Sequence, residues 1–139
     1  MSALTRTLFP LPEYRRTPWS LLAWWESRRL TYNVVVGGAG LLTLGAVAIV
    51  GLLPPAPPVP GVPWARLLGG AVVYGVAANL CYSLGWLAEV AMRALWGEEA
   101  PCAGPALFRQ GLSFAVGLTL LPIPLVCLSW VVRALAHLL

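Results

Sequence analysis

Three long apolar stretches constrain the fold of this chain more than any other feature of its sequence. They cover residues 33–53, 65–88 and 111–132. A helix rises about 1.5 Å per residue and the hydrocarbon core of a bilayer is about 30 Å thick, so each stretch can cross a membrane as one helix. Only 10% of the residues are charged, which excludes an ordinary soluble domain. The sequence therefore predicts an all-α membrane protein with three transmembrane helices.

A fourth helix is predicted before the first stretch. Thr17 followed by Pro18 is a favourable helix start, and the segment from there to residue 30 carries aromatic rings and then Arg28 and Arg29. Such a composition suits the headgroup layer, as an anchor or as a docking surface for a lipid or partner. We therefore divide the chain into residues 1–31, a cytoplasmic arm with an interfacial amphipathic helix, and residues 32–139, the transmembrane domain.

The tryptophans of this segment and of the span ends are predicted to anchor the protein at the membrane interfaces. Trp24 and Trp25 each stand four residues before an arginine, a spacing that permits two stacked pairs. A cleaved signal peptide has a shorter leader, so we expect the segment to be retained as an anchor. The predicted anchors are Trp19, Trp24, Trp25, Trp64, Trp96 and Trp130.

The arginines predict the orientation. Seven of the nine precede the first span or flank the connection between the second and third, and only Arg66 and Arg133 fall on the other side. By the positive-inside rule the N-terminus is cytoplasmic and the C-terminus is outside, in a bacterial inner (plasma) membrane. The net charge of +4 is then an orientation signal with some attraction to anionic lipid. We expect the lipid bilayer and other membrane subunits as partners, and no nucleic acid.

Proline and glycine mark the connections between these helices. Six prolines between residues 54 and 63 predict a stiff external connector, with a ligand for an SH3-like partner as a minor alternative. Residues 97–106 predict an acidic, turn-rich loop. Pro122 and Pro124 predict a kink near the middle of the third span. The glycines at positions 37, 38 and 40 lack the ending of a phosphate loop and favour close helix approach instead.

The second span carries a polar and aromatic stripe on one helical face. Its members recur at steps of four and three, which places them together. Asn79 near the predicted midplane and Tyr82 one turn away need partners from another helix, whereas Glu89 stands in the favourable order for an ion pair with Arg93. The stripe is either a polar clasp within a bundle or between subunits, or a proton or substrate path. It consists of Gly75, Asn79, Tyr82, Trp86, Glu89 and Arg93.

A second group of residues, before the first span, is predicted to lie on the same cytoplasmic side as Glu89 and Arg93. An interhelical salt-bridge network would join Glu89 to Glu26 and to an arginine of that group. This cytoplasmic-side cluster consists of Glu26, Arg28, Arg29, Tyr32 and Asn33.

Catalysis has little support in the sequence. The chain has no Asp, its only histidine is His137, and neither GxSxG nor HExxH occurs. Cys81, Cys102 and Cys127 form no CxxC pair, so we interpret them as free thiols, with Cys81 as nucleophile the minor alternative. We expect no enzyme, no cofactor and no metal site.

Two short motifs carry a resemblance. Residues 25–33 read WESRRLTYN and residues 78–82 read ANLCY. This resembles a pattern in small uncharacterised bacterial inner-membrane proteins with a WE-x-RR-x-x-YN start and an AN-x-CY second helix. The resemblance covers about a third of the chain and brings no known activity. It implies that the two segments form one site or one interface, although the proline-rich connector and the double-proline third span are not part of that pattern.

Three function classes follow from these observations. The leading expectation is a structural or accessory subunit of a larger or homo-oligomeric membrane assembly, because small-residue faces and a polar stripe favour helix association. The alternative is a small oligomeric channel or transporter whose pore is lined by the stripe. An enzyme acting on a lipid is the third.

Overall fold

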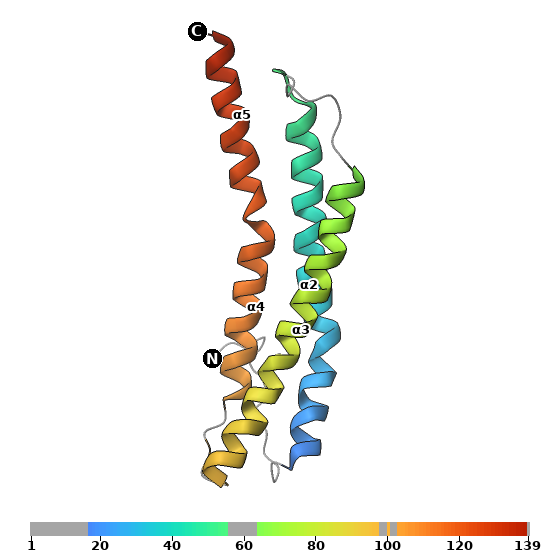
Figure 1. The fold of residues 1–139 in the computed structure, drawn as a ribbon, viewed down its shortest axis with the longest axis vertical. Coiled ribbons are helices and arrows are strands. Elements are labelled where there is room, and N and C mark those ends of the chain that lie inside the picture. Colours follow the sequence, from blue (N-terminus) through green and yellow to red (C-terminus); the bar gives the residue numbers. More distant parts are fainter. Residues whose placement is uncertain (1–16, 56–63, 98–99, 101–102, 139) are drawn as a thin grey trace, which may run out of the picture.

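The computed structural model describes residues 17–55, 64–97, 100 and 103–138, and the part it describes is almost entirely helical, without strands. Four helices follow in the order α2 (Pro18–Leu52), α3 (Trp64–Trp96), α4 (Gly104–Leu120) and α5 (Pro122–Leu138). α2 runs up the molecule, α3 returns, and α4 and α5 together run up again (Figure 1). Pro18–Leu52, Trp64–Trp96 and Gly104–Leu138 are each long and apolar enough to cross a membrane. The predicted helical fold, with three helices that could span a membrane, is confirmed.

α2 begins where the sequence predicts and then continues further than predicted. Thr17 caps it, its Oγ1 accepting a hydrogen bond from the Ser20 amide at 3.2 Å, with Pro18 in the first turn. The helix runs without a break to Leu52, so the boundary predicted between residues 31 and 32 is not present. The physical reason is that Trp25 and Tyr32, on either side of that boundary, are buried on one face and pack into one core.

The predicted kink in the third span is present. α4 ends at Leu120 and α5 begins at Pro122, which cannot donate the amide hydrogen that a continuous helix needs. α4 also starts at Gly104, inside the segment predicted as a loop, because Pro105 is tolerated in a first helical turn. The remaining predictions for residues 1–16, for most of the proline-rich connector and for Cys102 lie outside the described residues.

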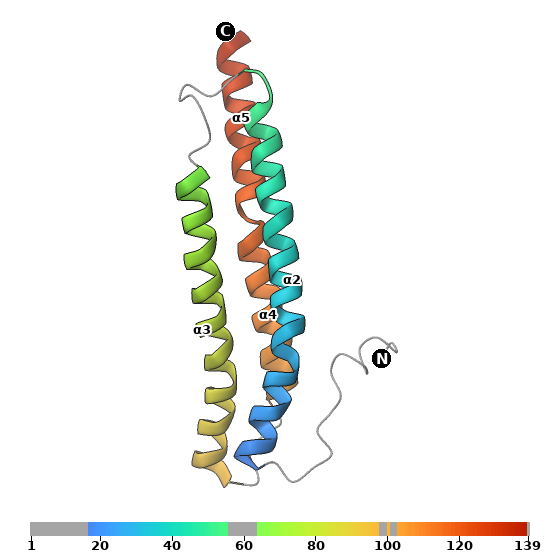
Figure 2. The ribbon, with the colours of Figure 1, turned by 90° about the vertical axis from the view of Figure 1, so that its right-hand side faces the viewer.

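The buried core occupies the lower half of the molecule, where α2, α3 and α4 meet. Above it the helices separate: α3 contacts α2 and α4 but not α5, and Figure 2 shows α3 standing apart from the α2–α5 pair at its upper end. α5 has no buried residue. The core cluster is Trp25, Tyr32, Val36, Ala78, Tyr82, Phe108 and Ala115.

Candidate functional site

A buried carboxylate joins the three helices at the lower end of the bundle. Glu89 of α3 is only 5% exposed. Its carboxylate accepts a hydrogen bond from Trp25 Nε1 of α2 at 2.8 Å and another from the Gly104 amide at 3.2 Å. Gly104 is the first residue of α4, so the negative charge lies at a helix N-terminus, where unpaired amides and the helix dipole stabilise an anion. Glu89 thereby caps α4 and ties it to the other two helices.

Two glycines allow this close approach. A Cβ atom on Gly104 would lie 2.6 Å from Oε2 of Glu89, and a Cβ on Gly85 would lie 2.7 Å from Cη2 of Trp25. Both distances are shorter than atoms tolerate, so any larger residue would displace the carboxylate or the indole. Neither glycine was predicted from the sequence as part of a site. Gly85 stands three residues after Tyr82 and four before Glu89, so the helical spacing of the stripe could have identified it.

Aromatic rings pack around Trp25, one of the two donors to this carboxylate. The Tyr82 hydroxyl donates to the Trp25 carbonyl, and the two rings meet edge to face with centroids 5.4 Å apart. Phe108 of α4 meets both rings at 6.2 Å between centroids. Such edge-to-face contacts are favourable beyond the area they bury. We call Trp25, Tyr82, Glu89 and Gly104 together the Glu89 clasp.

The prediction of Trp25 as an interface anchor is wrong, because this side chain is 2% exposed and belongs to the core. Its indole N–H has a buried acceptor in Glu89, which removes the cost of burying it. Trp19, Trp64 and Trp96 are exposed near helix ends, as expected of anchors. Of the other two predicted anchors, Trp24 is partly buried against the core and Trp130 donates to the Pro54 carbonyl at 3.2 Å.

The predicted salt-bridge network around Glu89 is also wrong. Among the described residues, Glu89 has no arginine within ion-pair distance, and the predicted pair with Arg93 is not formed. Glu26 instead pairs with Arg29 on the same helix at 2.7 Å. Glu26 lies on the exposed face of α2 whereas Glu89 points into the bundle, so the two carboxylates face different surroundings.

Of the two predicted Trp–Arg pairs, the one between Trp24 and Arg28 is present and the one between Trp25 and Arg29 is not. Arg28 lies over the Trp24 ring at 3.9 Å from its centroid. Arg29 lies over Tyr82, at 5.1 Å, and not over Trp25, since the Trp25 ring has turned into the core. Arg29 Nη2 also donates to the Ser83 hydroxyl at 3.3 Å, which links α2 to α3.

The two segments that carry the sequence resemblance lie against each other. Asn79 Nδ2 donates to Asn33 Oδ1 at 3.0 Å, and the Tyr32 hydroxyl donates to the Ala78 carbonyl at 3.2 Å. Asn79 therefore has its partner on another helix, as the sequence analysis expects. Asn33 therefore belongs to the contact with Asn79. It does not join a cluster around Glu89, because Glu89 lies ten residues beyond Asn79 on α3. Trp86, the remaining member of the stripe, packs partly buried against the core.

A second polar contact, which was not predicted from the sequence, joins the helices higher up. The Tyr74 hydroxyl lies 2.7 Å from Thr119 Oγ1 and 3.0 Å from the Ala115 carbonyl, to which it donates. Thr43 Oγ1 of α2 donates to the Thr119 carbonyl at 2.7 Å. Tyr74 stands four residues before Ala78 and eight before Tyr82, so the helical period that revealed the stripe could also have revealed Tyr74.

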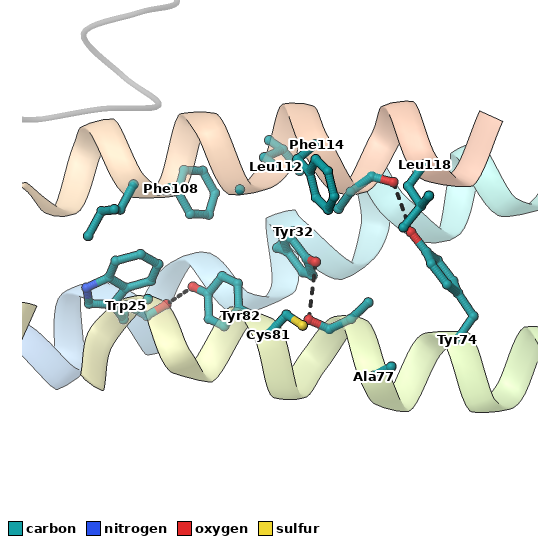
Figure 3. Close-up of a pocket in the computed structure, with 15 residues that line it drawn as sticks. Trp25, Tyr32, Tyr74, Ala77, Cys81, Tyr82, Phe108, Leu112, Phe114 and Leu118 are labelled. Atoms are coloured by element: carbon teal, nitrogen blue, oxygen red, sulfur yellow. Dashed lines mark hydrogen bonds between the residues drawn. The ribbon is translucent and has the colours of Figure 1, made fainter. Parts of the chain in front are cut away.

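An apolar groove opens between α3 and α4. Its cavity measures about 250 Å³. Figure 3 shows Phe108, Leu112 and Phe114 of α4 on one side and Cys81 and Tyr82 of α3 on the other, with α2 behind. The hydroxyls of the tyrosines that reach the groove already bond to other protein atoms, so its recognition of any occupant rests on shape and apolar contact. We call this the α3–α4 groove.

Metal ligands and thiols are the other candidate groups. The described residues contain no group of three potential metal ligands, and Cys81 and Cys127 are free and exposed. Comparisons with protein-family models, with curated proteins and with solved structures find no match to this chain. The arrangement of the polar side chains is therefore the basis for proposing a function.

Proposed function

We propose that this chain is a non-catalytic structural or accessory subunit of a membrane assembly, with copies of itself or with other subunits. The observation that carries the proposal is the Glu89 clasp. A buried carboxylate in the lower bundle is a candidate for proton or substrate transfer, but here Trp25 and Gly104 occupy its oxygens. Tyr82 and Asn79 are likewise bonded to α2. The polar stripe serves to hold the chain's own helices together.

The same arrangement disfavours the alternative, a channel or transporter lined by the stripe. A pore needs polar groups that face water, whereas these groups face their helical neighbours. The two functions differ in their response to Asn79→Leu and Glu89→Gln. A transporter would lose solute flux in proteoliposomes while its assembly stayed intact, and that result would contradict the accessory role.

The outer surface supports association with a neighbouring subunit. The α3–α4 groove is apolar, and Phe114 beside it is 73% exposed. Gly111 lines the groove, and a Cβ there would meet no atom within 4 Å, so the groove has room for the side chains of another transmembrane helix. In lipid, close van der Waals packing of this kind drives helix association.

The test is gentle detergent extraction of the full chain followed by native mass measurement. We expect a defined complex heavier than the 14.8 kDa chain. Gly111→Leu should fill the groove and remove the companion subunit. Gly117→Leu is the matched control, because Gly117 lies on the same helix, outside the groove, and also has no atom within 4 Å of its Cβ position. A monodisperse monomer without companion would rule out the proposal.

We also propose that the protein lies in a bacterial inner membrane with its N-terminus in the cytoplasm. The support is the distribution of the arginines, seven on the N-terminal side against two on the other. The lower end of the bundle, with the Glu89 clasp, would then face the cytoplasm.

A further inference from the structure

Arg28 and Arg29 are neighbours on α2, but their guanidinium groups have different partners. Arg29 donates from Nε and Nη2 to the two carboxylate oxygens of Glu26, at 2.9 Å and 2.7 Å. This ion pair is neutral, and it uses the edge of the guanidinium group whose two parallel N–H bonds match a carboxylate. Arg28 has no carboxylate within ion-pair distance among the described residues. Its positive charge is therefore not balanced there.

The corresponding edge of Arg28 has no acceptor. Arg28 Nη1 donates to the Trp24 carbonyl at 3.0 Å and to the Ser27 hydroxyl at 3.2 Å, and these two bonds stay within α2. In the part of the chain that the structure describes, Arg28 Nε is buried without a hydrogen-bond partner, and no hydrogen bond involves Nη2. Nε and Nη2 are the two atoms with which Arg29 holds Glu26. Arg28 therefore lacks the oxyanion that Arg29 has.

Trp24 supports this guanidinium group and lacks an acceptor as well. Arg28 Cζ lies 3.9 Å from the centroid of the Trp24 ring, which is a cation–π contact. The Trp24 ring in turn meets the Phe108 ring edge to face, with centroids 6.3 Å apart. The indole N–H of Trp24 is buried and has no hydrogen-bond partner among the described residues. Buried donors in proteins nearly always have an acceptor, so two unpaired N–H groups in one stacked pair indicate a missing one. We call these two residues the Trp24–Arg28 pair.

The Trp24–Arg28 pair lies at the edge of the apolar layer. Arg29 is the last charged residue of α2, and the first apolar stretch begins at residue 33. Arg28 precedes that position by five residues, about 7–8 Å along the helix, which is the depth of lipid headgroups. Val35 and Leu42 follow Arg28 at steps of seven, so they lie above it on the same face of α2. Both side chains are exposed.

We propose that the Trp24–Arg28 pair binds the phosphate of one anionic phospholipid of the bilayer. The phosphate oxygens accept from Nε and Nη2 of Arg28 and from the indole N–H of Trp24, while an acyl chain runs upward over Val35 and Leu42. Both side chains of the pair are only partly buried, so they can turn these N–H groups toward the phosphate. The phosphate balances the charge of Arg28 and matches its bidentate edge. The proposal does not rest on the accessory role, because neither residue lines the α3–α4 groove.

Two other occupants fit the Trp24–Arg28 pair less well. A free phosphate ion would balance the charge but leave the exposed apolar face above the pair uncovered. A second copy of the chain in the same orientation, packed symmetrically on this face, would bring its own Arg28 to the same depth, and like charges repel. A phospholipid supplies both the negative charge at the depth of Arg28 and the apolar chain above it.

The experiment is native mass measurement of the full chain in mild detergent, titrated with phosphatidylglycerol or with phosphatidylcholine of the same acyl chains. We expect phosphatidylglycerol to bind about fivefold more tightly, the effect typical of one arginine near an anionic surface. Arg28→Gln should abolish this preference, and it should fold because the hydrogen bonds it loses stay within α2. The matched control replaces both Glu26 and Arg29 by Gln. It removes a neutral ion pair from the same turn and should keep the preference.

A second pair of variants tests the indole without changing a charge. Trp24→Phe keeps an aromatic ring beside the guanidinium group and removes the indole N–H, so the affinity for phosphatidylglycerol should fall about two- to tenfold. Trp19→Phe removes the same group from an exposed tryptophan of the same helix and should leave the affinity unchanged. Equal affinities of the two variants would contradict the proposed role of Trp24.

Three results would overturn the proposal as a whole: equal binding of the two lipids, a preference that survives Arg28→Gln, or equal loss in the control without the Glu26–Arg29 pair. Inorganic phosphate in place of the lipid should not bind, and its binding would assign the Trp24–Arg28 pair to a free anion. Companion subunits that depend on Gly111 are scored in the same spectra. Failure of the lipid proposal is therefore distinguishable from failure of the accessory role.

Discussion

Glu89 illustrates how one residue can hold three helices. Its two hydrogen bonds come from uncharged donors, the indole of Trp25 and the amide of Gly104, and the carboxylate is nearly inaccessible. Hydrogen bonds to a charged group contribute more than neutral ones, and a buried donor left without an acceptor is costly. Glu89 is therefore the polar side chain on which the lower bundle depends most.

Replacing Glu89 by Gln tests this dependence. The neutral Gln side chain places no negative charge at the α4 N-terminus. Its NH₂ group is itself a donor and would face either the Trp25 or the Gly104 N–H donor. We expect the free energy of unfolding to fall by about 1–3 kcal/mol, measured by thermal unfolding in detergent. Glu26→Gln is the control: its ion pair is exposed, and its loss should cost about 0–1 kcal/mol. An unchanged melting temperature for Glu89→Gln would contradict the clasp.

At the scale of the helix, α5 differs from the other elements. It contains no buried residue, does not contact α3, and is separated from α4 by the break at Leu121. α4 by contrast buries Phe108, Ala115 and Thr119 between its two neighbours. Segments with few buried contacts open most easily.

The prediction at this scale is faster amide exchange in α5 than in α4. Residues 126–138 of α5 should exchange more rapidly than residues 108–120 of α4, because this part of α5 contains no buried residue. Hydrogen–deuterium exchange with mass spectrometry in detergent measures both. Equal protection of the two helices in a monomeric sample would show that α5 is held by contacts absent from this fold.

The elements themselves were largely predictable, because they depend on local chemistry. The Thr17 cap, the long apolar stretches and the break at Pro122 are each set by residues close in sequence. The separate interfacial helix was wrong for a non-local reason. Aromatic rings followed by Arg28 and Arg29 suggested a boundary, but the burial of Trp25 and Tyr32 in one core keeps the helix continuous.

For the whole molecule, the orientation of the chain across the membrane can be tested. With three spans and a cytoplasmic N-terminus, His137 lies outside the cell. In a variant without the three native cysteines, His137→Cys should react with a membrane-impermeant thiol reagent on intact spheroplasts. Labelling that required lysis would reverse the proposed orientation, and with it the assignment of the Glu89 clasp to the cytoplasmic side.

The candidate site was only partly predictable. The helical spacing correctly placed Asn79 and Tyr82 in contacts with another helix, but it gave Glu89 the wrong partners and left out Tyr74 and Gly85. A polar stripe in the sequence specifies only which face of one helix carries the polar side chains. Which groups face it depends on how far the neighbouring helices are rotated and shifted, and no local pattern records that offset.

The sequence by itself determined that this chain forms long apolar helices, that the first begins at Pro18, that the third span breaks at Pro122, and which face of α3 carries polar groups. Those properties follow from hydrophobic run length, capping and proline, all of which act within a few turns. Only the tertiary structure decided that Trp25 turns inward, that Gly104 brings a helix N-terminus to Glu89, and that Asn33 meets Asn79. Those contacts arise from packing between helices distant in sequence, where small offsets select the partner of each polar group.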